Sequence, residues 1–399
     1  MIAPFAVGRL PQIHFGESVR ARVPELAASC GRHVLLVTGA HSLRASRHWE
    51  PLLAGFRQHG LEVRTLAVSG EPSPALVDGA VREHRGTAID VVVAVGGGSA
   101  LDAGKAIAGL LPSGRPVGDF LEDVGLGLPY EGPSTPLVAV PTSAGTGSEA
   151  TRNAVLSEVG ERGFKKSFRH DALVPRWAVV DSELLESCPR PLIAADGMDA
   201  LTQLLESYVS TRASAFTDAI AESGLAAARD GLLLWYEGGG DQRAARSRMA
   251  WAALASGLAL AQAGLGAVHG LAAALGARFP LPHGYVCGTL ASAATAVNVA
   301  ALRAREPANP AIAKYARAWG ILASGQVTEV SSVPEDAPER LVGLLEEWCR
   351  RLELPRLGAR GVGEEQVPAL VASSRGSSMK TNPIALTDDE VGEVLRRRL

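Results

Sequence analysis

The sequence has few cysteines, and they lie far apart. Only four occur among its 399 residues, and no two of them form a Cys-x-x-Cys pair; they are Cys30, Cys188, Cys287 and Cys349. Closely spaced pairs are typical of zinc knuckles and redox motifs, and dense cysteines are typical of small disulfide-linked secreted domains. Their absence argues against those classes and predicts reduced thiols in a cytoplasmic protein.

Strong charge and long apolar runs are also missing. The formal net charge is −3 and no long basic run occurs, so neither nucleic acid nor a membrane is an expected partner. The apolar stretch 249–274 is interrupted by Ser256, Gln262 and His269, so no unbroken run has the length of a membrane span. The first residues do not resemble a secretion signal. The remaining composition, 47% hydrophobic and 20% charged, is typical of a globular protein that acts on a small molecule.

The most informative segment is a glycine-rich turn. The apolar run 91–95 predicts a buried strand, which leads into Gly96-Gly97-Gly98-Ser99 and then into an alanine-rich segment typical of a helix. Glycine lacks a Cβ, so this backbone can lie against a bulky anion, and the start of a helix favours negative charge. The spacing differs from the Gly-x-Gly-x-x-Gly fingerprint of many dinucleotide sites. The turn predicts a pyrophosphate site, with helix packing alone as the alternative.

Strand-like and helix-like segments alternate through the first part of the chain. The expected strands are 33–38, 61–68, 90–95 and 136–141, and the expected helices are 49–59, 74–85 and 102–111. This alternation predicts a parallel sheet with helices on both faces and with ligands at the carboxyl ends of the strands. A second turn rich in glycine and serine, residues 141–149, is expected at the same edge.

From residue 184 onward the pattern is helical. The expected helices are 215–235, 242–265, 310–322, 338–352, 363–373 and 388–399. We therefore predict two domains: an α/β dinucleotide-binding domain with a parallel Rossmann-like sheet over residues 1–183, and an all-helical catalytic domain over residues 184–399. The active site is expected in the cleft between them.

Few side chains of the second half suit metal or acid–base chemistry. Beyond residue 85 the only histidines are His170, His269 and His283, while Asp199 and Gln203 are four residues apart and share one face of a predicted helix. Carboxylate and imidazole groups are ligands for Fe2+ and Zn2+. By spacing alone, hydrogen-bonded core histidines remain the alternative.

The whole chain resembles the iron-containing alcohol dehydrogenase family, which also includes the maleylacetate reductases. The matching segments occur in the same order and cover nearly the entire sequence. They are Gly96–Ser99 with Asp102 and Lys105, residues 141–149, residues 197–202 with Glu206 and Tyr208, residues 268–270, residues 281–284, and residues 377–380 with Asn382 and Pro383. The resemblance implies the two-domain plan that this family shares with dehydroquinate synthase.

The resemblance also implies roles for individual residues. The cofactor-binding residues would be Gly97, Gly98, Ser99, Asp102, Thr142, Ser143, Thr146, Ser148 and Lys166. Among them, the glycines and Ser99 would hold the pyrophosphate, the residues of the second turn would line the adenine and ribose side, and Lys166 would lie near the nicotinamide ribose. Asp199, His269 and His283 correspond to three of the four metal ligands of the family.

Two departures from the family pattern affect the metal. Gln203 occupies the position of the fourth ligand, usually a histidine, and Ala273 occupies the position of a second histidine. A carboxamide is a weak ligand, so metal binding should be weaker. Two alternatives stay open: Fe2+ or Zn2+ held by Asp199, Gln203, His269 and His283, or a metal-free site. Without a metal, His269 or His283 would polarise the carbonyl or donate a proton, with Gln203 as a further catalytic group.

The resemblance implies an NAD(P)-dependent oxidoreductase that interconverts an alcohol and an aldehyde or ketone by hydride transfer. Where NAD-restricted members carry an acidic residue, this chain has Gly39 with Arg44 nearby, so NAD and NADP are both open. Two other functions also stay open. One is a metal-independent maleylacetate-type reductase acting on an oxo-dicarboxylate, and the other is an NAD-using sugar-phosphate cyclase or lyase. Family habit leads us to expect a homodimer.

Overall fold

The chain forms two units, which are described separately. The computed structural model describes residues 2–121, 123–161, 163–324 and 334–399. Residues Gly8–Cys188 make up the first, here called the α/β unit, and Met1–Val7 with Pro189–Leu399 make up the second, here called the helical unit. The change between units falls at Cys188–Pro189, and the domain boundary expected after residue 183 stays a prediction.

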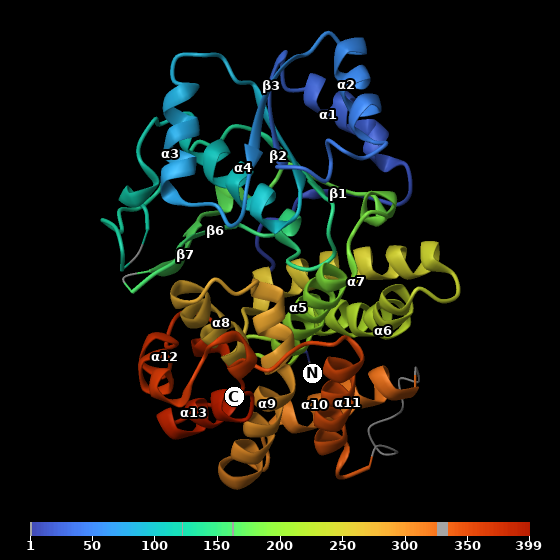
Figure 1. Ribbon diagram of the computed structural model, residues 1–399, viewed down its shortest axis with the longest axis vertical. Coiled ribbons are helices and arrows are strands. Elements are labelled where there is room, and N and C mark those ends of the chain that lie inside the picture. Colours follow the sequence, from blue (N-terminus) through green and yellow to red (C-terminus); the bar gives the residue numbers. More distant parts are fainter. Residues whose placement is uncertain (1, 122, 162, 325–333) are drawn as a thin grey trace. The chain divides into compact units, whose positions relative to one another are not determined.

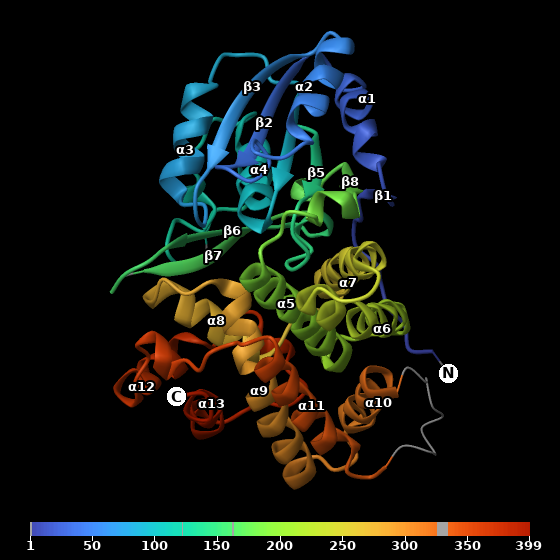
Figure 2. The same ribbon diagram turned by 45° about the vertical axis from the view of Figure 1, so that its right-hand side comes forward.

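The α/β unit is built on a six-stranded sheet whose paired strands all run parallel (Figure 2). From one edge to the other, the strands are β1 (Gln12–Phe15), β8 (Trp177–Val180), β5 (Leu137–Pro141), β4 (Val91–Gly96), β2 (His33–Gly39) and β3 (Glu62–Val68). Parallel pairing of β2, β3, β4 and β5 follows the prediction, and the expected fold class is confirmed. The strand β1 lies at an edge of the sheet, and the expected homodimer stays a prediction.

Helices cover both faces of this sheet (Figure 1). On one face lie α1 (Val23–Ala28) and α2 (Trp49–Gln58), and on the other lie α3 (Pro74–Glu83) and α4 (Gly98–Leu110). Side chains alternate between the two resulting cores: Val34 faces the α1 side, and Leu35 faces the α4 side. Because both faces of the central strands are buried, β4 is apolar at every position, as expected for an interior parallel strand.

Two features of this unit differ from the sequence prediction. The helix α4 begins at Gly98, not at residue 102. The N–H groups of a first helical turn have no intrahelical acceptor, so a glycine there costs the helix little free energy. Strands β6 (Asn153–Glu158) and β7 (Phe164–Arg169) form a separate antiparallel pair that we did not predict. The segment Phe164–Arg169 carries four polar residues among its six, so it lacks the apolar content of the strands that we recognised.

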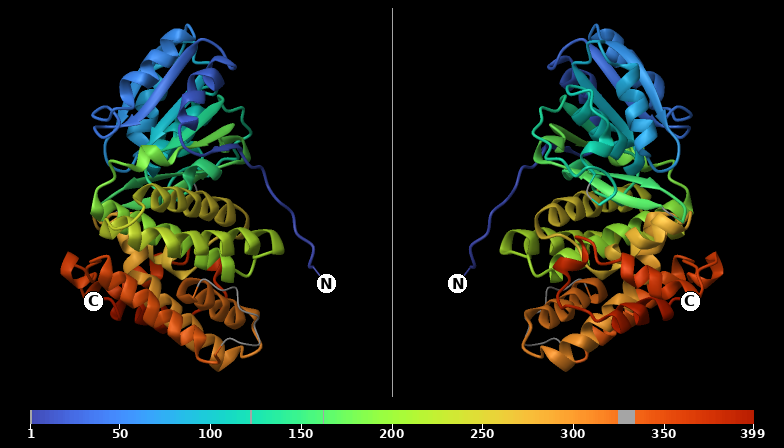
Figure 3. Two further views of the ribbon diagram at one scale, coloured as in Figure 1. Left: turned by 90° about the vertical axis from the view of Figure 1, so that its right-hand side faces the viewer. Right: turned by 90° about the vertical axis from the view of Figure 1, so that its left-hand side faces the viewer.

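The helical unit contains helices throughout its described residues. They are α5 (Arg190–Val209), α6 (Ala215–Glu237), α7 (Gln242–Ala263), α8 (Ala267–Arg278), α9 (His283–Arg305), α10 (Pro310–Ser324), α11 (Ala337–Arg351), α12 (Val367–Ser373) and α13 (Asp388–Arg396). Helices α6 and α7 form a hairpin and lie side by side (Figure 3). Helix α5 is buried along most of its length and contacts α6, α7 and α9. The side chains on α5 are therefore held from several sides.

Helix α9 is long and apolar enough, by length and composition, to cross a membrane. In this structure, however, 89% of the most apolar 18-residue stretch of α9 is buried inside the protein. Helices α7 and α8 pass the same test only as a pair, and they are bent by 100° at the break between them. Burial of this extent is typical of a core helix. The cytoplasmic location and the absence of a membrane partner stay predictions.

Candidate functional site

The two glycine-rich turns of the α/β unit lie against each other at the carboxyl ends of β4 and β5. The amide of Thr142 donates to the carbonyl of Gly96 at 2.9 Å. A Cβ added to Gly98 would lie 2.8 Å from Cγ2 of Thr146, closer than real Cβ contacts allow. A Cβ at Gly97 would lie 3.4 Å from Oγ of Ser143. The absence of side chains on these glycines thus lets the two turns come together, as we predicted for one edge of the sheet.

The start of α4 offers a site for an anion. Gly97 is the N-cap, with extended backbone, and the amides of Ala100 and Leu101 already donate to its carbonyl. The amides of Gly98 and Ser99 precede the first intrahelical bonds, and they point outward at the positive end of the helix dipole. A phosphate group fits this position because free N–H groups and the dipole both favour negative charge there.

A buried ion pair braces α4 against the second turn. The ammonium of Lys105 is 1% exposed, donates to the carbonyl of Ser148 at 3.0 Å and to the hydroxyl of Thr151 at 2.9 Å, and lies 3.0 Å from Asp102. The hydroxyl of Ser148 donates to the same carboxylate at 2.6 Å. Burial lowers the pKa of Lys105, and the charge of Asp102 partly opposes that shift. Asp102 and Ser148 therefore hold the turns in place, and their predicted contact with a cofactor stays a prediction.

Lys166 lies on β7, opposite Leu156 of β6. Its ammonium pairs with the carboxylate of Asp123 at 2.7 Å, and the Lys166 side chain is 35% exposed. Its role near a nicotinamide ribose remains a prediction.

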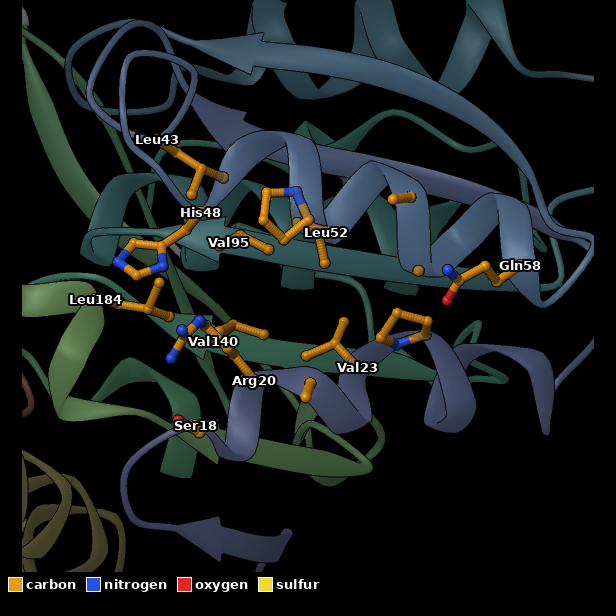
Figure 4. Close-up of a pocket in the computed structure, with 15 residues that line it drawn as sticks. Ser18, Arg20, Val23, Leu43, His48, Leu52, Gln58, Val95, Val140 and Leu184 are labelled. Atoms are coloured by element: carbon orange, nitrogen blue, oxygen red, sulfur yellow. The ribbon is translucent and has the colours of Figure 1, made fainter.

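The α/β unit also contains a groove that the sequence did not indicate. It has a volume of about 550 Å³ and runs over the sheet between α1 and α2 (Figure 4). Val95 and Val140, at the carboxyl ends of β4 and β5, line it together with Leu43 and His48 from the loop after β2 and Leu184 from the turn after β8. Burial lowers the pKa of His48, and the charges of Arg20 and Arg47 lower it further, so this imidazole favours its neutral form.

In the helical unit, four side chains from three helices converge. Asp199 comes from α5, His269 from α8, and His283 and Cys287 from α9; together they are called the four-residue cluster. One potential ligand atom from each lies within 4.8 Å of the others. The structure therefore brings together Asp199, His269 and His283, as the resemblance implied, and adds a cysteine that the sequence analysis did not consider.

Distances within the cluster are short enough for direct contact. The Nε2 atom of His269 lies 3.3 Å from Oδ1 of Asp199, and the Nε2 atom of His283 lies 4.0 Å from the same oxygen. His283 is the first residue of α9, and Pro282 precedes it as the N-cap. Cys287 follows one helical turn later and shares the face of His283.

A carboxylate behind the cluster orients His269. Oε2 of Glu206 lies 2.6 Å from Nδ1 of His269, and Oε1 of Glu206 accepts from the amide of Val268 at 2.7 Å. A buried carboxylate on one imidazole nitrogen fixes the proton there and leaves the other nitrogen as a lone-pair donor. The Nε2 atom of His269 faces Asp199 and Cys287. Glu206 matches the family motif, but no sequence pattern indicated this contact.

The charges around the cluster favour a cation within it. Burial by itself would lower the pKa of His269. The interactions with Cys287, Glu206 and Asp199 together have a larger, opposite effect, so this pKa lies well above its ordinary value. Burial raises the pKa of Asp199, yet the neighbouring His283 and His269 lower it to about 2. The site thus stabilises positive charge beside an ionised Asp199. Its O, N, N and S donors form a set that suits Zn2+ or Fe2+.

Gln203 lies one turn after Asp199 on α5, as predicted, but its carbonyl oxygen is engaged elsewhere. It is 3% exposed and accepts a hydrogen bond from the hydroxyl of Ser256 at 2.8 Å. Ser256 comes from α7, so this bond ties Gln203 to a neighbouring helix. The ligand and catalytic roles expected for Gln203 stay predictions.

Comparison with known proteins now identifies the family. A family profile described as iron-containing alcohol dehydrogenase matches residues 11–182, and the profile of the family's C-terminal part matches residues 193–399. The chain belongs to the iron-containing alcohol dehydrogenase family. Alcohol dehydrogenase 4 of Saccharomyces cerevisiae is 33% identical over 86% of this chain and 87% of its own. The 1-propanol dehydrogenase of Citrobacter freundii is 34% identical over 78% of each chain.

Solved structures agree with this assignment. The crystal structure of a 1,3-propanediol oxidoreductase superposes with a TM-score of 0.87 at 28% identity and covers 100% of both chains. Membership of the iron-containing alcohol dehydrogenase family makes this chain an NAD(P)-dependent oxidoreductase of the alcohol–carbonyl type, as the resemblance predicted. The family implies a dinucleotide and a metal, and the helical unit contains a candidate metal site.

Proposed function

We propose that this member of the iron-containing alcohol dehydrogenase family oxidises short primary alcohols to aldehydes, and reduces the aldehydes in the reverse direction. The names of the relatives above support primary alcohols of a few carbons as the substrate class. The observation on which the proposal depends is the meeting of Asp199, His269 and His283, with Glu206 behind His269. Asp199 and His269 are 1% and 6% exposed, and buried charged groups are typically paired or coordinate a metal.

We propose that the dinucleotide pyrophosphate binds at the start of α4, on the amides of Gly98 and Ser99. The helix dipole and the free N–H groups support this placement. The neighbouring groove would take the adenosine end, because Val95 leads directly into the glycine-rich turn and the lining is mostly apolar. The nicotinamide supplies the acceptor or donor of hydride when it is bound.

We propose that NADP(H) serves at least as well as NAD(H). Among the described residues, apart from its two chain neighbours, nothing lies within 4 Å of a Cβ added to Gly39, so a phosphate on the ribose would meet open space at the end of β2. The guanidinium of Arg44 lies over the ring of Trp49, 5.2 Å from its centre, in the loop that follows. Arginine pairs well with phosphate, and no carboxylate at position 39 repels it.

We propose that Asp199, His269 and His283 hold a divalent metal. A bound metal would polarise the substrate oxygen and lower the pKa of an alcohol. Glu206 keeps the proton of His269 on Nδ1, so that Nε2 presents its lone pair. The bond from Ser256 holds the carbonyl of Gln203 in place, which leaves the amide nitrogen of Gln203 as the end that can donate to a substrate oxygen.

The proposal is tested by following the absorbance of reduced nicotinamide with purified protein, a series of primary alcohols and their aldehydes, and both dinucleotides. We expect turnover with alcohols of a few carbons, and His269→Ala to abolish turnover while leaving dinucleotide affinity nearly unchanged. Turnover only with an unsaturated oxo-dicarboxylate would contradict the proposed substrate class. Undiminished turnover in the His269→Ala variant would contradict the proposed site.

A further inference from the structure

The side chain of Cys287 is placed as a metal donor. It is 0% exposed and lies on α9 one turn after His283, on the same helix face. Its sulfur lies 3.6 Å from Nε2 of His269 and 3.7 Å from Nε2 of His283. These are the two imidazole nitrogens that face Asp199, so the sulfur occupies the fourth corner of the same cluster.

The spacing matches a tetrahedral site. Zinc bonds of about 2.3 Å to sulfur and about 2.05 Å to nitrogen, at the tetrahedral angle, put the two donor atoms about 3.6 Å apart. The measured distances from the Cys287 sulfur are 3.6 and 3.7 Å. A nitrogen donor and an oxygen donor on the same zinc ion would be about 3.4 Å apart. The Nε2 atom of His269 and Oδ1 of Asp199 are 3.3 Å apart. The Nε2 atom of His283, 4.0 Å from Oδ1 of Asp199, would have to move closer to that oxygen.

Gln203 is less well placed for this position. Its carbonyl oxygen, the only atom through which a carboxamide normally binds a metal, accepts from Ser256 at 2.8 Å. Binding a metal through that oxygen would compete with the bond to Ser256. The sulfur of Cys287, in contrast, already contacts both histidines.

Binding through Cys287 would give the ion a second anionic donor beside Asp199, while the carboxylate of Glu206 stays behind His269 on its Nδ1 atom. On binding, the Sγ–H bond of Cys287 breaks, its proton passes to solvent, and an Sγ–metal bond forms without any change of oxidation state. Thiolate donors suit Zn2+.

We propose that the thiolate of Cys287, and not the carboxamide of Gln203, is the fourth protein donor of the metal site. This inference rests on the proposed function, in which Asp199, His269 and His283 hold a metal. A site with one thiolate would differ from the ligand set that the resemblance implies.

The test is to load the purified full chain with Co2+ and with Zn2+. For the cobalt form we expect about one metal ion per chain and a thiolate-to-cobalt charge-transfer band in the near ultraviolet. X-ray absorption of the zinc form should show one sulfur neighbour at about 2.3 Å. The band should be lost in Cys287→Ser and kept in Gln203→Ala. The matched control is Cys349→Ser, since Cys349 is a buried cysteine on α11 that donates to the carbonyl of Gly288 and should leave the band unchanged.

The outcomes separate the two proposals. Bound metal with only nitrogen and oxygen neighbours in the wild-type protein would overturn the assignment of Cys287 and leave the proposed function intact. A band that persists in Cys287→Ser would overturn it as well. Full turnover without any bound metal would overturn both the metal part of the proposed function and this inference. The X-ray absorption measurement needs only the wild-type protein, so the test does not depend on the folding of a variant.

Discussion

Replacing Glu206 by glutamine tests how the protein prepares His269 for a metal. Glu206 is 8% exposed, and its two oxygens accept from Nδ1 of His269 and from the amide of Val268. A glutamine has nearly the same shape but only one oxygen. It can keep one of the two hydrogen bonds, and its amide group then faces the other N–H donor.

The expected magnitude follows from these contacts. Leaving one buried donor unpaired costs about 1–3 kcal/mol of folding free energy. Loss of the carboxylate behind a metal-binding histidine typically lowers metal affinity by about 10- to 100-fold. That range corresponds to about 1.4–2.7 kcal/mol of binding free energy. We therefore expect Glu206→Gln to fold, to melt at a lower temperature, and to bind Zn2+ at least about tenfold more weakly.

Metal affinity can be measured by competition with a coloured chelator, and folding by thermal denaturation of the metal-free protein. The matched control is Glu222→Gln, because Glu222 is also a partly buried, hydrogen-bonded carboxylate of the helical unit, but it pairs with Tyr208 and Arg317. That variant should lose stability without losing metal affinity. If Glu206→Gln bound Zn2+ as tightly as the wild type, the reasoning about His269 would be refuted.

Three further predictions concern the α/β unit. Gly98→Val should weaken dinucleotide binding at least about tenfold, because its side chain would meet Thr146, and titration of the fluorescence of reduced nicotinamide measures this loss. Gly39→Asp should lower kcat/KM for NADPH by at least about tenfold relative to NADH, since a carboxylate would face the extra phosphate; an unchanged ratio would contradict the proposed preference. Burial raises the pKa of Glu149 from 4.5 to about 7, although the nearby charge of Lys105 opposes this shift. The folded protein therefore holds this proton more tightly than the unfolded chain, and the free energy of unfolding should fall by up to about 3 kcal/mol as the pH rises from 4.5 to 7. Glu149→Gln should remove that fall in denaturant unfolding at pH 5 and pH 8, and an equal fall in both proteins would show that another group is responsible.

Periodicity was enough to predict the parallel sheet, and the anion site at the glycine-rich turn stays a prediction. The strand 91–95 is apolar at every position because it is covered on both faces. The glycines that follow it indicate a place where another group can come close to the backbone. The start of α4 was misplaced because three adjacent glycines disfavour a helix interior, whereas only Gly98 lies in the first turn of α4, which tolerates it. The hairpin of β6 and β7 was missed because β7 is mostly polar and half-buried, so it lacks the apolar signal of the other strands.

The helical unit was less accessible to sequence reasoning. Asp199, His269 and His283 come from three different helices, and only the family resemblance brought them together. The spacing of His283 and Cys287, four residues apart, was visible, but it pointed to a shared face only once residue 283 was known to begin α9. The contact of Glu206 with His269 joins residues 63 positions apart, which no local pattern encodes.

In our proposal, dinucleotide binding at the start of α4 and activation of the alcohol by a metal in the four-residue cluster are separable parts of one reaction. Removing the metal separates them, with dinucleotide affinity and alcohol oxidation measured before and after Zn2+ is restored. We expect the stripped protein to bind the dinucleotide as before, to oxidise alcohol no faster than a blank without enzyme, and to recover when one equivalent of Zn2+ is added. Oxidation at the full rate by the stripped protein would contradict the claim.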